Sequence, residues 1–299
     1  MIEVVKLGQN IGAEIKGVDL SKPINDEMFQ KISQAFFDNE VVVFRDQDLQ
    51  PHDQVLFTRK FGDLEKHVRK ESLLKDMEEI FVISNMIGDD GKPIGAQDVG
   101  RFWHSDLSYK KVPSMLSALY SIVVPIDENG IAKGNTQYSS TTYAYATLPD
   151  ELKQKLAKLK AVHSYKYYRM INREAQRVDA LNGGKKVIEP ELTEEMLRAT
   201  PDVNPPLVRT HPITKKKCLF INEGHTSHIE GMSEKDSKDL LHSLYEHMIK
   251  PEFKYVHSWK KGDLLMWDNC ALQHKATFDY DLPLQRLMYR TTVRGSEAY

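Results

Sequence analysis

Short segments of strand-forming residues follow one another from residue 79 to residue 294, and they restrict the possible fold more than any other feature of this sequence. Turn-forming residues separate the segments, as is typical of the strands of a sandwich or barrel. We therefore predict a β core. The segments are EIFVISN (79–85), SALYSIVVP (117–125), TQYSS (136–140), PLVRTH (206–211), KKCLFIN (216–222), FKYVHSW (253–259), DLLMWD (263–268) and RLMYRTTVR (286–294).

Helical periodicity is limited to a few stretches, which we expect to flank the β core. In the first of them Met28, Ile32, Ala35 and Phe36 recur at the spacing of one helix face. Short N-terminal segments resemble strands and complete a mainly β fold with flanking helices. The predicted helices cover residues 25–40, 51–64, 148–161 and 233–250, and the N-terminal strands cover 2–7, 13–20 and 41–46.

The chain shows no internal repeat, low-complexity tract or flexible linker, so we expect a single domain over residues 1–299. Residues 165–206 are unlike the rest because they are polar and interrupted by glycine and proline. Such a stretch inside a β domain is either a lid over a site or an excursion over the surface. The interrupting residues are Gly183, Gly184, Pro190, Pro201, Pro205 and Pro206.

Composition narrows the class of protein. The formal net charge of -2 gives no reason to expect nucleic acid or an anionic membrane as a partner. No apolar run reaches the roughly 18 residues that span a bilayer, and the N-terminus does not resemble a signal peptide. Cys218 and Cys270 are too few for a disulfide framework, so we expect reduced cysteines in a cytoplasmic protein.

The segment RFWHSDLSY (101–109) places His104 and Asp106 two residues apart. On a strand such residues point the same way, so we expect both side chains to face one pocket. A hydrogen-bonded structural pair and a metal site explain this motif equally well when it is taken alone.

The last predicted strand carries Arg286 and Arg290 on one face, about 13 Å apart along the strand. Buried unpaired guanidinium groups are very costly, so this face either meets solvent or lines a pocket that holds anions. Arg290 could also pair with a nearby carboxylate such as Asp279 or Asp281.

Upstream of that strand His274 offers a third metal ligand. Two imidazoles and one carboxylate leave three adjacent positions of an octahedron open, which suits non-haem Fe(II) in oxygen activation. A 2-oxo acid would fill two of these positions and O2 the third, and Arg286 would pair with the distal carboxylate of the acid. A rival reading is a zinc site on His225 and His228.

The sequence resembles the Fe(II)/2-oxoglutarate-dependent dioxygenases typified by taurine dioxygenase and 2,4-dichlorophenoxyacetate dioxygenase. The ligands, the arginines and the segment GDLLMWDN occur in the family's order and spacing. The fold that this resemblance implies is a double-stranded β-helix, or jelly roll, with flanking helices. The matching segments are IGAEIKGVDLSKP, FWHSD, GNTQY, PLVRTHP, LFIN, HIEG, GDLLMWDN and RLMYR.

The resemblance also implies a role for individual residues. Its iron ligands correspond to His104, Asp106 and His274. Thr136 and Arg286 match the residues that bind 2-oxoglutarate. Arg290 matches the arginine that binds the substrate's anionic group, and His67 falls near a histidine that contacts substrate in taurine dioxygenase.

The implied activity is hydroxylation of a small anionic substrate, a carboxylate or sulfonate, with Fe(II), 2-oxoglutarate and O2 and with release of succinate and CO2. Cleavage of a C–O, C–S or C–N bond can follow. Two departures argue against taurine: Gly100 stands where taurine dioxygenase has asparagine, and the loop before Thr136 is longer.

Other readings stay open at this point. The segments around GKPIG and GRFWHSD also resemble the isonitrile-forming branch, which carries out multi-step oxidation of N-substituted amino acids. A jelly roll could equally be a non-catalytic metal-binding module. The resemblance leaves a homo-oligomer open as well.

Overall fold

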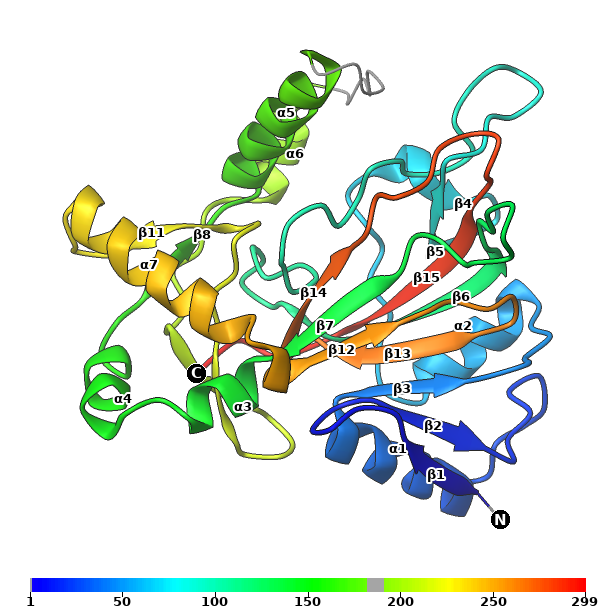
Figure 1. Ribbon diagram of the computed structural model, residues 1–299, viewed down its shortest axis with the longest axis horizontal. Helices are drawn as coiled ribbons and strands as arrows, with labels where there is room; N and C mark the ends of the chain where they lie inside the picture. The colour runs from blue at the N-terminus through cyan, green and yellow to red at the C-terminus, as the bar shows by residue number, and fades with distance from the viewer. Residues whose placement is uncertain (1, 182–190) are drawn as a thin grey trace.

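Most of the predicted strands form two β-sheets that lie face to face (Figure 1). The computed structural model describes residues 2–181 and 191–299. In spatial order the large sheet contains β1 (Glu3–Lys6), β2 (Ala13–Lys16), β3 (Val41–Phe44), β13 (Leu264–Asp268), β6 (Ser114–Val123), β15 (Leu287–Arg294), β5 (Met77–Ser84) and β4 (Leu73–Leu74). The small sheet contains β12 (Lys254–His257), β7 (Thr136–Ser140) and β14 (Leu272–Ala276).

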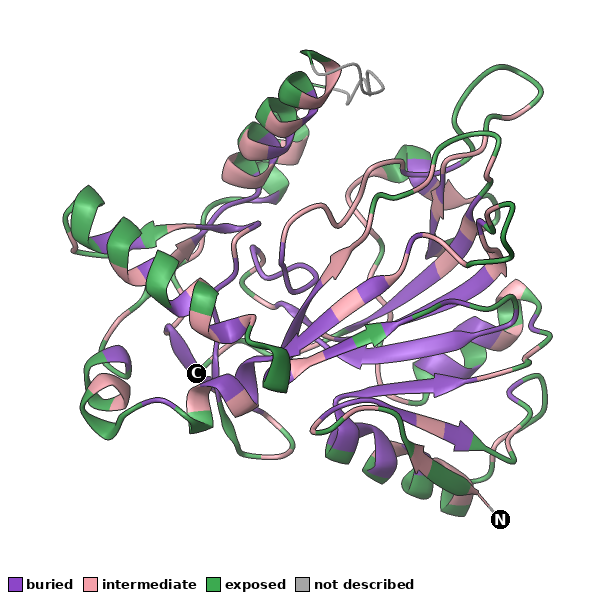
Figure 2. Cartoon of the chain, viewed as in Figure 1, coloured by how far each residue is buried: buried purple, intermediate pink, exposed green. Residues whose placement is uncertain are grey.

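The central strands of the large sheet are apolar on both faces because each face carries its own core. Side chains alternate along a strand, so Leu264 and Met266 of β13 point to one side while Leu265 and Trp267 point to the other. The first side packs against helices, and the second packs against the small sheet. The buried central strands stand out in Figure 2.

Two helices, α1 (Asp26–Asn39) and α2 (Pro51–Arg59), cover the outer face of the large sheet. Helix α1 begins where the Asn25 side chain accepts a hydrogen bond from the backbone N–H of Met28. It buries Ile32 and Phe36 completely. This packing confirms the helix face that the spacing of apolar residues predicts.

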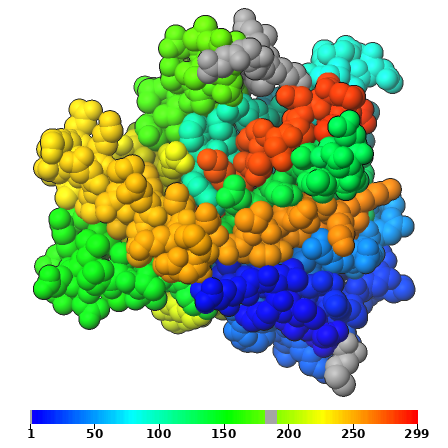
Figure 3. All heavy atoms as spheres, viewed as in Figure 1, coloured from blue at the N-terminus to red at the C-terminus, as the bar shows by residue number. Residues whose placement is uncertain are grey.

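A third core lies beside these two sheets, where helices pack on two two-stranded sheets. Figure 3 shows α7, in yellow, forming much of the surface of this part. The helices of this core are α3 (Thr141–Ala146), α4 (Asp150–Leu156) and α7 (Glu234–Met248). The two-stranded sheets pair β8 (Ala161–His163) with β11 (Thr226–Ile229) and β9 (Val208–Thr210) with β10 (Lys217–Leu219). Two further helices are α5 (Tyr165–Leu181) and α6 (Glu194–Ala199). Short 3₁₀ turns cover Lys70–Ser72 and Pro251–Phe253.

The mainly β fold with flanking helices is confirmed, and the two facing sheets form the jelly roll that the sequence predicts. The structure differs most from the sequence-based prediction in residues 165–206, where it has the helices α5 and α6. Gly183, Gly184 and Pro190 lie outside the described residues. Cys218 and Cys270 are buried and free. Within residues 2–181 and 191–299, every helix is too short or too polar to cross a lipid bilayer.

Removal of a buried side chain from α1 should destabilise the protein. We expect Ile32→Ala to lower the free energy of unfolding by about 2–5 kcal/mol, because Ile32 is fully buried and its loss leaves a cavity. Leu56→Ala is the control, since Leu56 is 61% exposed and its truncation should change stability by less than about 0.5 kcal/mol. Denaturant unfolding measures both, and equal losses would contradict the packing of α1.

Candidate active site

The structure brings His104, Asp106 and His274 into one buried cluster, with one possible ligand atom of each within 4.8 Å of the others. Backbone pairing causes this approach. The N–H of His104 donates to the carbonyl of His274 at 3.0 Å, and the N–H of His274 donates to the carbonyl of His104 at 2.8 Å. The two imidazole rings therefore lie side by side, with centroids 4.1 Å apart.

The H-x-D motif does not lie on a strand, contrary to the expectation from its spacing. His104 makes a single antiparallel bridge, and the chain then turns sharply through residues 106–109, with Leu107 at a φ of 55°. The side chain of Asn269 fixes the turn, because its Oδ1 accepts from the N–H of Asp106 at 3.1 Å. Asp106 and His104 nevertheless belong to the same cluster, as predicted.

The protonation states in the cluster suit a divalent metal ion. His104 Nδ1 lies 2.9 Å from the carbonyl oxygen of Phe102, which can only accept, so Nδ1 carries the proton and Nε2 is a free ligand. Burial, followed by the nearby imidazole of His104, lowers the pKa of His274 well below its ordinary value. His274 is therefore neutral, and its Nδ1 is buried with no hydrogen-bond partner among the described residues.

Asp106 supplies a carboxylate. Burial alone would raise the pKa of this carboxyl, but the positive charge of Arg290 holds the pKa well below its ordinary value. Arg290 Nη1 donates to Asp106 Oδ1 at 2.8 Å, and Ser117 Oγ donates to Oδ2 at 2.7 Å. Two neutral imidazoles and one held carboxylate make a donor set that fits non-haem Fe(II).

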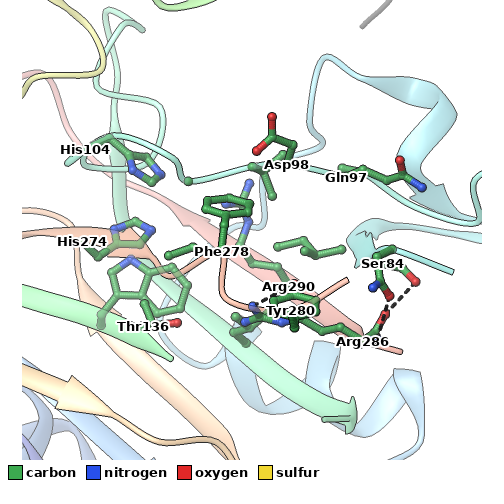
Figure 4. A pocket seen from close by; sticks show the side chains of 18 residues that line it. Ser84, Gln97, Asp98, His104, Thr136, His274, Phe278, Tyr280, Arg286 and Arg290 are labelled. Carbon is green, nitrogen blue, oxygen red and sulfur yellow. Dashed lines mark hydrogen bonds between the residues drawn. The ribbon is translucent and has the colours of Figure 1, made fainter. Parts of the chain in front are cut away.

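A pocket of about 660 Å³ extends from His104 and His274 toward Arg286 (Figure 4). Thr136 lies on its wall, and Thr136 Oγ1 accepts from Trp259 Nε1 at 3.0 Å. The two histidines stand at one end of the pocket and Arg286 stands at the other. We call this space the first pocket.

Arg286 is a buried cation at the far end of the first pocket. Its side chain is buried, yet it pairs with no carboxylate among the described residues. Its contacts are with Met288 Sδ, at 3.2 and 3.1 Å, and with the Tyr280 hydroxyl at 3.3 Å. The sequence predicts that the strand with the two arginines faces either solvent or a pocket that holds anions. The structure therefore favours the pocket.

A second pocket of about 490 Å³ lies beside the first and shares His104, Arg290, Val99 and Gly100 with it. Its lining is mainly aromatic. The residues that line the second pocket but not the first are His67, Arg69, Phe81, Asp106, Leu107, Tyr109, Tyr165, Tyr168 and His225.

Phe81 supports two of the predicted site residues in the second pocket. The His67 ring lies on Phe81 with a centroid separation of 4.3 Å, and the Arg290 guanidinium lies 5.0 Å from the same ring. His67 Nδ1 accepts from the N–H of Arg69 at 3.1 Å, so Nε2 carries the proton. The structure thus groups His67 and Arg290 around one space, but the partner of Arg290 is Asp106 rather than Asp279 or Asp281.

His225 and His228 have different surroundings, so the structure gives no support to a zinc site built on both. His228 is exposed on β11, whereas His225 is buried in the second pocket. Asn222 and Ser108 hold His225 in place. The backbone N–H of His225 donates to Asn222 Oδ1, Asn222 Nδ2 donates to Ser108 Oγ, and Ser108 Oγ lies 3.3 Å from His225 Nδ1.

Another buried group that could hold a metal, His211 with Asp268 and Cys270, is explained by turn structure. His211 Nδ1 accepts from the backbone N–H groups of Ile213 and Thr214, at 3.1 and 2.9 Å. Nε2 must then carry the proton that it donates to Asp268 Oδ2 at 2.8 Å. Both ring nitrogens are used within the protein, so neither offers a lone pair to a metal.

Comparison with known proteins agrees with this geometry. The model of the taurine catabolism dioxygenase TauD, TfdA family matches residues 3–292. The chain belongs to the TauD/TfdA family of dioxygenases. It is thus an Fe(II)- and 2-oxoglutarate-dependent enzyme that uses O2.

Relatives and solved structures of this TauD/TfdA chain match it over nearly its whole length. It is 32% identical to the α-ketoglutarate-dependent 2,4-dichlorophenoxyacetate dioxygenase of Cupriavidus pinatubonensis, covering 94% of this chain and 93% of that one. It is 30% identical to the alkylsulfatase of Acinetobacter baylyi, covering 98% and 85%. The crystal structure of AAD-2 in complex with Mn(II) and N-oxalylglycine is 31% identical, with a TM-score of 0.76 and coverage of 100% and 99%.

Sequence reasoning missed most of the second pocket of this TauD/TfdA enzyme. Phe81, Tyr109 and Tyr165 resemble ordinary core residues in the sequence, and they come from separate segments. The aromatic run HSYKYYRM at 163–170 is the one signal that could have found Tyr165 and Tyr168, because it lies in the stretch proposed as a lid.

Gly134 gives a sharp test of the first pocket. At a φ of 71°, an added Cβ would lie 2.8 Å from Arg286 Nη1 and 2.7 Å from the Tyr280 ring. We expect Gly134→Ala to displace Arg286 and to weaken 2-oxoglutarate binding about tenfold or more. Gly130→Ala is the matched control, because Gly130 has a φ of 78° with nothing within 4 Å of an added Cβ. Equal dissociation constants in anaerobic titrations of the two variants would contradict this account.

Proposed function

We propose that this enzyme hydroxylates a small organic anion in the second pocket, while 2-oxoglutarate lies in the first pocket and the metal is held between them. His104, Asp106 and His274 would hold Fe(II). When bound, iron and 2-oxoglutarate together supply the oxidising power that converts a substrate C–H bond to C–OH, with O2 consumed and succinate and CO2 released. The protein's own part is to position the reactants.

The observation that carries this proposal is the unpaired Arg286. A buried guanidinium with no carboxylate among the described residues is costly unless a bound anion neutralises it. A dicarboxylate that chelates the metal through its 2-oxo acid group would place its other carboxylate beside Arg286, at the opposite end of the first pocket. Thr136 would add a hydroxyl contact, since it lines the same pocket.

Arg290 would act on both sides of the site. It holds the Asp106 carboxylate in place, and it also lines both pockets. Its Nε is buried with no partner among the described residues. We propose that Arg290 Nε and His67 donate hydrogen bonds to the anionic group of the substrate.

A count of charges supports a substrate with one negative charge. Fe(II) brings two positive charges, Arg69, Arg286 and Arg290 bring one each, and Asp98 and Asp106 bring one negative charge each. The two carboxylates of 2-oxoglutarate leave one positive charge over. A monoanionic carboxylate, sulfonate or sulfate ester would neutralise it, and relatives named for dichlorophenoxyacetate, phenoxypropionate, sulfonate and alkylsulfate chemistry lie in this range.

Substitution of Arg286 tests the placement of 2-oxoglutarate. We expect Arg286→Gln to weaken 2-oxoglutarate binding about 30-fold or more, because the distal carboxylate loses its charged partner. Arg294→Gln is the control, since Arg294 lies eight residues after Arg286, at the end of β15, and its side chain is 59% exposed. The visible absorption of the anaerobic Fe(II) complex, titrated with 2-oxoglutarate, gives both constants. Wild-type affinity in Arg286→Gln would overturn the placement.

A substrate screen tests the reaction itself. Small carboxylates, sulfonates, sulfate esters and N-substituted amino acids are tested for stimulation of O2 uptake and succinate release in the presence of Fe(II) and 2-oxoglutarate. We expect stimulation by monoanionic acids, and its loss in His104→Ala and His274→Ala, which each remove one proposed metal ligand. Stimulation only by N-substituted amino acids would favour the isonitrile-forming reaction. Absence of succinate release with every compound would contradict the proposed substrate class.

A further inference from the structure

Tyr109 lines the second pocket, and nothing in the protein accounts for its hydroxyl. The residue is buried, and its hydroxyl oxygen has no hydrogen-bond partner among the described residues. A buried donor without a partner costs about 1–3 kcal/mol, so native structures rarely leave one without a reason. A water molecule or a ligand in the pocket is the remaining partner.

The position of this hydroxyl is fixed. Tyr109 ends the turn that begins at Asp106, and the N–H of Lys110 closes that turn on the carbonyl of Leu107 at 2.9 Å. The Tyr109 ring packs between two others, with centroids 4.8 Å from Tyr165 and 5.0 Å from His225. The ring therefore cannot swing away to find another partner.

The charged side chains of Arg290 and Asp106 are close enough to Tyr109 to affect its pKa. Burial raises the pKa of Tyr109 well above its ordinary value, with a further contribution from Tyr165, while the charges of Arg290 and Asp106 act on it in opposite directions. Tyr109 thus stays a neutral O–H donor. Its ring borders an outer groove as well, but the hydroxyl oxygen itself is buried.

We propose that the Tyr109 hydroxyl donates a hydrogen bond to a neutral oxygen of the substrate, and so selects acids that carry an ether, ester or carbonyl oxygen in addition to their anionic group. This inference rests on the proposed function, because it assumes that the substrate occupies the second pocket. The two donors differ in task. Arg290 recognises charge, whereas a phenol with no charge distinguishes an oxygen from the methylene group of equal size.

Matched pairs of acids test this selection. Phenoxyacetate and 3-phenylpropanoate differ only by an oxygen in place of a methylene, and so do hexyl sulfate and heptane-1-sulfonate. Dissociation constants are measured by calorimetry on the Mn(II) protein with N-oxalylglycine, so that no turnover occurs. In the wild type we expect the oxygen-bearing member of a pair to bind about tenfold more tightly. In Tyr109→Phe we expect the ratio within the pair to fall to about one, with the methylene member unchanged.

Tyr120→Phe is the control variant. It also removes a buried tyrosine hydroxyl, but that hydroxyl is used inside the protein by Gln47 and Leu49 and lines neither pocket. The ratio within each pair should stay at its wild-type value. Equal ratios in the wild type and Tyr109→Phe would overturn the role of Tyr109 alone. A wild-type protein that binds none of the four acids would overturn the proposed substrate class, and this inference with it.

Discussion

The ion pair between Asp106 and Arg290 is the interaction on which the site depends. It joins the turn after the histidine bridge to strand β15, and both side chains are buried. Removing one partner of a buried pair typically costs about 3–5 kcal/mol, because the other charge is left uncompensated. The pair also forms the boundary between the two pockets, since Arg290 lines both of them. One contact therefore fixes a proposed metal ligand and separates the spaces for the two organic reactants.

Arg286 and Arg290, which the strand pattern places on one face, have different neighbours. Arg290 is largely neutralised by Asp106, whereas Arg286 meets only a thioether and a phenol. A second carboxylate beside Arg286 would have removed the need for an anionic ligand there. The asymmetry is the reason why we propose the first pocket for the dicarboxylate and the second pocket, with its many aromatic residues, for a less charged molecule.

Sequence patterns predict the parts of this protein that rest on local spacing. Apolar periodicity predicts α1, and the parity of β15 predicts that Arg286 and Arg290 share a setting. Helix α5 was missed because the stretch as a whole is polar and its buried residues include Arg169, Asn172 and Gln176, although Tyr168, Ile171, Ala175 and Val178 recur at helical spacing. The second pocket was missed because its walls come from segments far apart in the chain, and only the fold brings these segments together.

The polar inner face of α5 has a structural reason that also bears on the site. Arg101 donates to Asp98 at 2.8 Å and to Asp179 of α5 at 2.6 Å, and Gln176 donates to Asp98 at 2.8 Å. These contacts hold the loop that runs to Gly100, which forms a wall of both pockets. At Gly100 an added Cβ would lie 3.5 Å from the His104 ring. A side chain there would fill space beside His104, and glycine leaves this space open.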